Sequence, residues 1–192
     1  MKTEKFLGHD CVSLENGILK LLTTQSIGPR ILSLGFVNGE NLLAELPNFV
    51  TDCPGCGTFH FYGGHRLWHA PEEPSRTYLP DDEPVTISIF QNGLKATQQT
   101  EPKTGLQKSI EIQLTADSAQ VTLTHRITNH SLWDVTCAPW AITQFKTGGM
   151  AIFPQIKTDT GVLPNRTLTL WPYTEMTNRN VHWGRDYILV QA

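Results

Sequence analysis

The chain has 192 residues, of which 39% are hydrophobic and 17% charged, with a formal net charge of −3 at pH 7. This length favours a single domain, because all-β domains often run beyond about 150 residues. The apolar content excludes a disordered chain, and the low, balanced charge argues against a nucleic-acid interface, which needs clustered Lys and Arg residues.

The N-terminal sequence MKTEKFLGHDC lacks the apolar core that a signal peptide requires. No apolar run approaches the roughly 18 residues of a membrane-spanning helix. We therefore expect a cytoplasmic protein without a membrane partner.

The first expected strands lie at about 18–25 and 30–37, bracketed by the turn sequences Asn16-Gly17 and Asn38-Gly39. The stretch from about 48 to 82 differs, because it is rich in Pro, Gly, His and aromatic residues and shows no alternation. A long irregular segment inside a compact domain is usually functional, so we predict a functional loop there.

Four cysteines occur, too few and too scattered for a secreted disulfide framework: Cys11, Cys53, Cys56 and Cys137. Cys53-Pro-Gly-Cys56 has C-x-x-C spacing, which suits a turn with two reduced thiols, half a zinc site or a redox pair. A zinc site would need a second ligand pair, and a thioredoxin-like pair should open a helix. We favour the reduced turn and expect no metal and no cofactor.

Residues 85–129 alternate between apolar and polar side chains, as in Val85, Ile87 and Ile89 or in Val121, Leu123 and His125. The turn sequences Asn92-Gly93, Lys103-Thr-Gly105 and Asp117-Ser118 divide this region. The pattern predicts a four-stranded antiparallel meander of half-buried strands.

No segment carries a sustained helical period with caps at both ends. Together with the alternation, this predicts an all-β fold in one domain, 1–192, an antiparallel β-sandwich with the functional loop at about 48–82. The last residues, Tyr187 to Ala192, predict a strand without charge or proline. An unpaired edge of that kind favours a homodimer formed through the sheet edge.

The segment Phe61 to Glu72 concentrates residue types that suit a sugar site. Aromatic rings stack on the apolar face of a pyranose, whereas Arg, His and carboxylate groups bond its hydroxyls. The candidates in this segment are Tyr62, His65, Arg66, Trp68, His69 and Glu72, beside Gly63-Gly64.

Structural interpretations of the same residues remain open. His65 could be a buried histidine, Trp68 a packing residue, and Arg66 and Glu72 a loop ion pair. His65 and His69 have the spacing of a helical metal pair, but the glycines before them and Pro71 after them disfavour a helix. His125 lies on an apolar strand face and could be a core histidine.

Three segments carry a resemblance to a known family. The first is Ile27-Gly-Pro-Arg30-Ile-Leu-Ser-Leu-Gly35 followed by Asn41-Leu-Leu43. The second is Gly63-Gly64-His65-Arg66-Leu67-Trp68 followed by Ala70-Pro71-Glu72, and the third is Arg126 to His130 followed by Trp140. They resemble the galactose-mutarotase-like superfamily, and in particular its DUF4380-like branch.

The resemblance implies a β-supersandwich, truncated here, whose concave sheet holds a monosaccharide or sugar derivative. Aldose 1-epimerases of this fold use a histidine acid and a glutamate base. The family's second histidine should fall near Ala138 to Gln144, where this chain has Trp140 and Thr143, and its base lies in a C-terminal portion that this chain lacks. From the residue types we expect a site that comprises catalytic His65, His69 and the substitute carboxylate Glu72, with substrate-binding Arg30, Tyr62, Arg66, Trp68, His125 and Trp140.

Three functions stay open. The first is a carbohydrate-binding, mutarotase-like protein. The second is an active aldose or sugar-phosphate epimerase, with His65 or His69 as acid and Glu72 as base. The third is a β-sandwich interaction module without a small ligand. Convergence of the candidate residues on one pocket would favour the first two.

Overall fold

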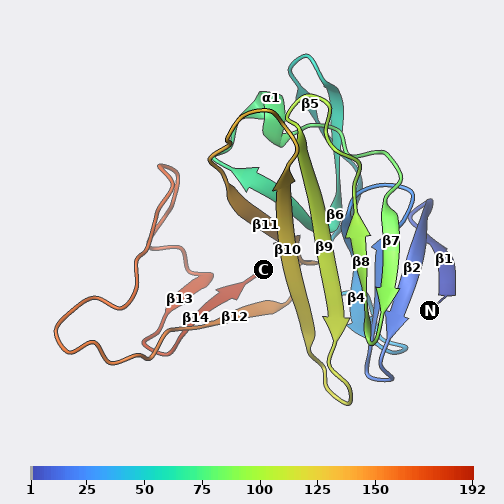
Figure 1. The fold of residues 1–192 in the computed structure, drawn as a ribbon. Helices are drawn as coiled ribbons and strands as arrows, with labels where there is room; N and C mark the ends of the chain where they lie inside the picture. Colours follow the sequence, from blue (N-terminus) through green and yellow to red (C-terminus); the bar gives the residue numbers. More distant parts are fainter. Residues whose placement is uncertain (1) are drawn as a thin grey trace. The chain divides into compact units, whose positions relative to one another are not determined.

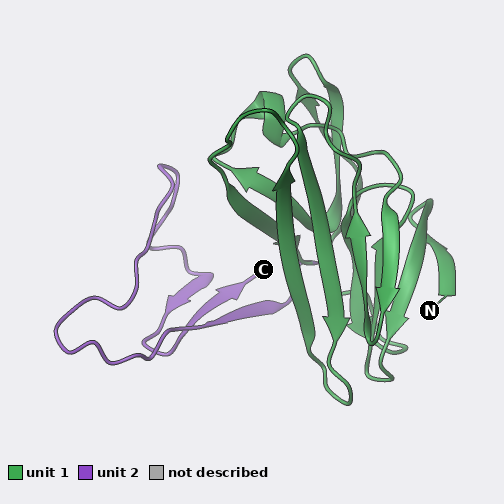
Figure 2. Ribbon diagram, in the orientation of Figure 1, with its two compact units in different colours: residues 1–145 green, residues 146–192 purple. Residues whose placement is uncertain are grey.

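A computed structural model describes residues 2–192. The chain forms two compact units, residues 1–145 and 146–192 (Figure 2), where the sequence predicts one domain over 1–192. Within residues 2–192, the strands of the second unit form a sheet of their own.

The first unit contains a seven-stranded sheet with the strand order β1-β2-β3-β4-β6-β11, in which β5 also pairs with β6. All of its pairings are antiparallel. The strands β3 and β4 confirm the two predicted near 18–25 and 30–37. The seven are β1 (Lys2–Phe6), β2 (His9–Glu15), β3 (Leu19–Thr24), β4 (Arg30–Phe36), β5 (Glu45–Cys53), β6 (Gly57–Ala70) and β11 (Ala138–Gln144).

The predicted meander is confirmed as a four-stranded sheet with the order β10-β9-β8-β7. Asn92 turns the chain between β7 and β8 with a φ of 59°, a left-handed conformation that Asn adopts more readily than most residues, and Gly93 already belongs to β8, paired with Phe90. The strands are β7 (Thr86–Phe90), β8 (Gly93–Thr97), β9 (Leu106–Leu114) and β10 (Val121–Asn129).

The two sheets of the first unit pack face to face, and Figure 1 shows β7 to β10 as one layer over β2, β4 and β6. Leu21, Ile31 and Leu67 of the seven-stranded sheet share one apolar cluster with Ile110 and Ile112 of the meander. The all-β, antiparallel sandwich predicted from the alternation is therefore confirmed for this unit.

The segment 48–82 is not the irregular loop that the sequence predicts, because β5, most of β6 and the short helix α1 (Pro74–Thr77) occupy much of it. Alternation is missing because residues 64–69 of β6 are buried on both faces. Gly63 and Gly64 have φ values of 84° and 70°, and a Cβ on either would overlap the backbone of Ala44 or Ile31. The glycines let neighbouring strands approach β6 closely.

The second unit holds a three-stranded sheet made of β12 (Met150–Pro154), β13 (Val181–Trp183) and β14 (Tyr187–Gln191). The predicted last strand, β14, pairs on both sides, with β12 and with β13. The unpaired edge on which the expected homodimer rested is thus absent, since β14 is the central strand.

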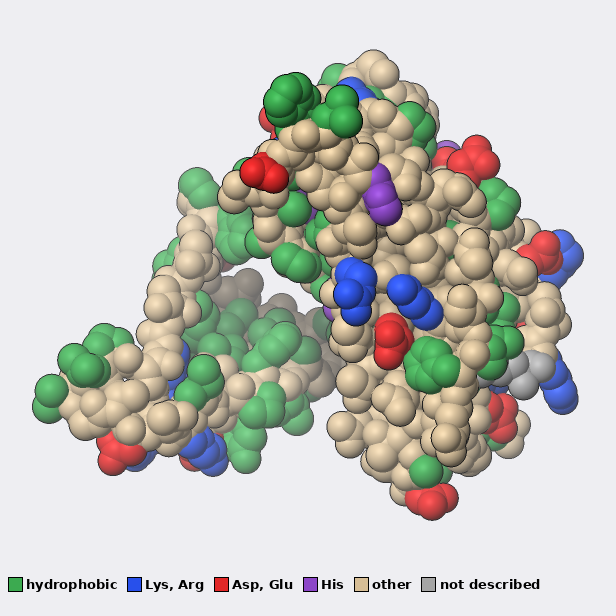
Figure 3. Space-filling view, viewed as in Figure 1, with side chains coloured by type: hydrophobic (Ala, Val, Ile, Leu, Met, Phe, Trp, Pro, Cys, Tyr) green, Lys and Arg blue, Asp and Glu red, His purple; other side chains and the backbone are tan. Residues whose placement is uncertain are grey.

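Many apolar side chains of the second unit lie at its surface, as the space-filling view in Figure 3 shows. Val162 is 99% exposed, Tyr173 82% and Trp171 53%. The 26 residues of the segment 155–180 contain no helix or strand to cover them. Among residues 2–192, no helix is long and apolar enough to cross a membrane.

The packing of the two sheets generates a stability prediction. Ile112 is fully buried in the shared cluster, so Ile112→Ala should lower the free energy of unfolding by about 3 kcal/mol through lost burial and a cavity. Ile89 on β7 is 66% exposed, and Ile89→Ala should change the free energy of unfolding by less than about 1 kcal/mol. Urea unfolding followed by circular dichroism measures both, and equal effects would contradict this assignment of the core.

Candidate functional site

Strand β6 separates the predicted site residues onto two faces of the sheet. His65, Leu67 and His69 point toward the meander: Leu67 packs in the shared core, and His65 bonds His125 of β10. Successive strand residues point to opposite sides, so Arg66 and Trp68 lie on the outer face. The predicted site residues of β6 therefore do not share one pocket, because His65 and His69 lie on one side of the sheet and Arg66 and Trp68 on the other.

The outer face gathers residues from three neighbouring strands. Arg30 of β4 is paired with Arg66, and on β11 Trp140 is paired with Trp68 and Gln144 with Gly64. Directly paired residues share one side of a sheet. We call this set, Arg30, Arg66, Trp68, Trp140 and Gln144, the arginine–tryptophan face.

Arg30 is held by several partners, although none of it is solvent-exposed. Its Nη1 donates to the carbonyl oxygen of Phe61 at 2.8 Å, and its Nη2 donates to that of His60 at 3.0 Å. Nη2 also pairs with Oδ1 of Asp81 at 2.5 Å. The guanidinium is thus a neutralised structural cation that ties β4 to β6 and to the segment after α1.

Arg66 differs from Arg30 in lacking a counter-ion. Its side chain is 2% exposed, its one hydrogen bond runs from Nη1 to the carbonyl oxygen of Phe61 at 2.9 Å, and within residues 2–192 it forms no ion pair. Its Cζ lies 4.5 Å from the ring centroid of Trp68 and 5.0 Å from that of Phe61. Burial, with the nearby Arg30 cation, lowers the pKa of Arg66 to about 10.

The arginine–tryptophan face also carries polar atoms without partners. In residues 2–192, Nε of Arg30, Nε of Arg66, Nε1 of Trp68 and Oε1 of Gln144 are buried and form no hydrogen bond to the protein. Each such buried group costs about 1–3 kcal/mol. Three unsatisfied donors and one acceptor thus lie on this single face, and buried polar groups without partners are uncommon in folded proteins.

Trp68 is 5% exposed because other rings surround it. Its ring centroid lies 5.1 Å from that of Tyr78, 5.3 Å from that of Trp140 and 5.6 Å from that of Phe59. The stacking on a sugar that the sequence assigns to Trp68 is therefore blocked in this conformation. Trp140 is only half-buried and is the tryptophan of this face that keeps an accessible surface.

Glu72 and Tyr62 lie at the margins of the arginine–tryptophan face. Glu72 is exposed and accepts a hydrogen bond from the hydroxyl of Tyr78, whose ring packs on Trp68. Burial and then this bond raise the pKa of Tyr78 to about 12. Tyr62 stacks on His60 with centroids 5.3 Å apart and lies 5.2 Å from Cζ of Arg30. The ion pair of Arg66 with Glu72 considered from the sequence is not formed.

His65 and His69 occupy the interior between the two sheets. His65 is 5% exposed, and its Nδ1 and Nε2 lie 2.8 Å from Oγ1 of Thr143 and from Nε2 of His125. Burial, then His125 and Arg66, lowers the pKa of His65 to about 4. Burial lowers the pKa of His69 too, and neither of its ring nitrogens has a partner. Neutral, enclosed imidazoles of this kind cannot reach a ligand on the outer face.

The sequence did not predict two residues of the outer face. Gln144 belongs to the arginine–tryptophan face, and Asp81 balances the charge of Arg30. Gln144 could have been found from the alternation of β11, in which Trp140, Ile142 and Gln144 share one side. Nothing local marks Asp81 as the partner of Arg30, 51 residues earlier in the chain. Within residues 2–192, no group of three or more His, Cys, Asp or Glu side chains is arranged to hold a metal ion.

Comparison with known proteins adds no relative. No family model, no curated protein and no solved structure matches the chain. The likeness to galactose-mutarotase-like proteins therefore stays a prediction based on the three segments, and function has to be argued from the residues themselves.

The histidine pair predicts a pH-dependent stability. His65 has a pKa of about 4 in the folded chain against 6.5 ordinarily. Between pH 6.5 and 4, its imidazole is therefore protonated in the unfolded chain and neutral in the folded chain. The free energy of unfolding should fall as the pH drops from 6.5 toward 4 and be insensitive to His65 above 6.5. Between pH 7.5 and 4.5, the free energy of unfolding of the unaltered protein should fall by about 2 kcal/mol more than that of the His65→Gln protein.

Urea titrations at the two pH values measure this difference. His182→Gln, which alters an exposed histidine of β13, is the matched control and should keep the pH dependence of the unaltered protein. Parallel curves for the unaltered and His65→Gln proteins would contradict the role given to His65.

Proposed function

We propose that this protein binds an acidic monosaccharide on the arginine–tryptophan face, as a carbohydrate-binding protein of the mutarotase-like kind. One observation carries the proposal: Arg66 is a buried guanidinium that forms no ion pair within residues 2–192. A buried charge is costly unless it is paired, and a carboxylate or phosphate group of a ligand would pair it in bidentate geometry.

The unsatisfied polar atoms support a polyhydroxylated ligand. Sugar hydroxyls both donate and accept hydrogen bonds, which suits the Nε donors of Arg30 and Arg66 beside the Oε1 acceptor of Gln144. The half-buried ring of Trp140 offers an apolar surface for the C–H face of a pyranose. Because Arg66 is 2% exposed, entry of the ligand requires the rings that cover its guanidinium, those of Trp68 and Phe61, to move.

Binding without catalysis is the better-supported alternative. An epimerase needs an acid and a base at the sugar ring, yet His65 and His69 lie on the opposite side of β6. Glu72 alone of the expected catalytic residues lies near the face, through Tyr78. The proposed activity is therefore recognition of the sugar.

Calorimetric titration tests the proposal with D-glucuronate, D-galacturonate and D-glucose 6-phosphate, and with D-glucose and D-galactose as neutral counterparts. We expect at least one acidic sugar to bind and its neutral counterpart to bind about tenfold more weakly or not at all. Arg66→Gln should weaken the binding of that acidic sugar by about 10- to 100-fold, since a hydrogen bond to a charged group contributes about 1.5–3 kcal/mol.

Trp140→Ala should weaken binding of the same sugar by about 1–2 kcal/mol, judged from the area that an aromatic ring buries. Trp133→Ala, at a residue 78% exposed between β10 and β11, is the matched control and should bind normally. Loss of binding in both variants would exclude a specific stacking role. If no sugar binds the folded protein at millimolar concentration, the interaction module without a small ligand is the correct function.

A further inference from the structure

A second chemical centre lies at the tip of the β5–β6 hairpin and is independent of the sugar site. The amide of Cys56 donates to the carbonyl oxygen of Cys53 at 2.9 Å, which closes a four-residue turn of Cys53, Pro54, Gly55 and Cys56. The two thiols are within hydrogen-bonding reach of one another. A turn of this size keeps the two Cα atoms within the roughly 7 Å that a disulfide spans.

A lysine from a distant segment lies against one of the two thiols. Nζ of Lys103, in the connection between β8 and β9, is 2.9 Å from Sγ of Cys56. The bonds from Cys53 and then Lys103 lower the pKa of Cys56, whereas burial raises that of Cys53 to about 11. Of the two thiols, Cys56 is therefore the one that loses its proton more readily.

Cys56 lines a cavity of about 380 Å³, and the lining also includes Lys103, Glu101 and Glu83. Cys56 itself is partly exposed, whereas Cys53 is buried. A small neutral molecule can therefore reach Sγ of Cys56 but not that of Cys53. This difference assigns the order of reaction: Cys56 attacks first.

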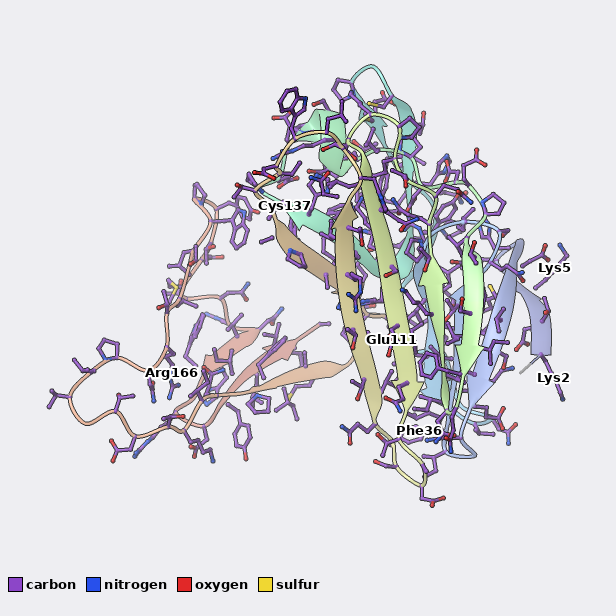
Figure 4. The ribbon with its side chains drawn as sticks, in the orientation of Figure 1. Lys2, Lys5, Phe36, Glu111, Cys137 and Arg166 are labelled. Atoms are coloured by element: carbon purple, nitrogen blue, oxygen red, sulfur yellow. The ribbon has the colours of Figure 1, made fainter. Side chains whose placement is uncertain are left out.

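The other cysteines lack this arrangement. Cys11 is fully buried and its pKa is raised to about 11 by burial. Cys137, labelled in Figure 4 just before β11, is partly buried and has no lysine Nζ bonded to its sulfur. A metal at Cys53 and Cys56 would need further ligands, and the described chain, residues 2–192, offers no such group.

We propose that Cys56 is a peroxide-reactive thiolate, that Lys103 activates it, and that Cys53 resolves the product as an intramolecular disulfide. The substrate class is a small hydroperoxide that enters the 380 Å³ cavity. Such chemistry follows the thiolate character and accessibility of the attacking sulfur.

The reaction has two steps when hydrogen peroxide is the oxidant. The Cys56 thiolate attacks one peroxide oxygen, so the S–O bond forms, the O–O bond breaks, and the hydroxide released takes a proton from the Lys103 ammonium group to leave as water. Sγ of Cys53 then attacks the sulfenic acid; the S–S bond forms, the S–O bond breaks, and the oxygen leaves as water with the Cys53 proton. Two thiols are oxidised and one peroxide is reduced to two waters.

Stoichiometric hydrogen peroxide added to the full chain tests the proposal, with peptide mass mapping as the readout. We expect a Cys53–Cys56 disulfide, with Cys11 and Cys137 still reduced. In Cys53→Ser protein, dimedone should trap a sulfenic acid on Cys56, and in Cys56→Ser protein neither product should form.

Lys103→Gln isolates the contribution of the lysine and should slow disulfide formation about tenfold by reducing the thiolate fraction. Lys95→Gln on β8 is the matched control and should react at the rate of the unaltered protein. Oxidation of Cys137 as fast as that of Cys56, or an unchanged rate in Lys103→Gln protein, would overturn the proposal. Circular dichroism of each variant establishes that a lost reaction is not a lost fold.

Discussion

Burial of β6 on both faces is the constraint on which the rest of the first unit depends. This strand pairs with β4, β5 and β11, which is possible because Gly63 and Gly64 bend it and leave room for the neighbouring backbones. Because both sides of this strand are buried, its polar side chains lie away from solvent on either side and need partners within the protein. The sheet thereby divides the polar residues of β6 into two layers with different chemistry.

The two layers satisfy their polar groups in different ways. Toward the meander, His65 shares a hydrogen bond with His125 and is kept uncharged, which suits an interior of low polarity. On the outer side Arg30 and Arg66 are paired across β4 and β6, and of these two cations only Arg30 forms an ion pair within residues 2–192, with the carboxylate of Asp81. These two buried guanidinium groups are therefore concentrated on one face of the sheet.

Local sequence signals predict the parts of this fold in which strands pair with their neighbours along the chain. The four-stranded meander follows from alternation and from turns such as Asn92-Gly93, because each hairpin joins consecutive strands. β6 was not predicted, since double burial removes the alternation that marks a strand. The geometry of the candidate site could not be predicted from sequence: His65 and Arg66 are adjacent in the chain and face opposite sides of the sheet, and the Arg30–Asp81 ion pair depends on tertiary structure alone.

The connection between β6 and β11 has a kinetic consequence. These two strands are neighbours in one sheet, yet the whole meander, β7 to β10, lies between them in the chain. Bringing the ends of so long a segment together costs more entropy while it is a flexible coil than after it has collapsed. Hairpins between consecutive strands form within microseconds, whereas pairings between distant segments are slow. The meander therefore acts as a folding template: once formed, it delivers β11 to the exposed edge of β6 and completes the seven-stranded sheet.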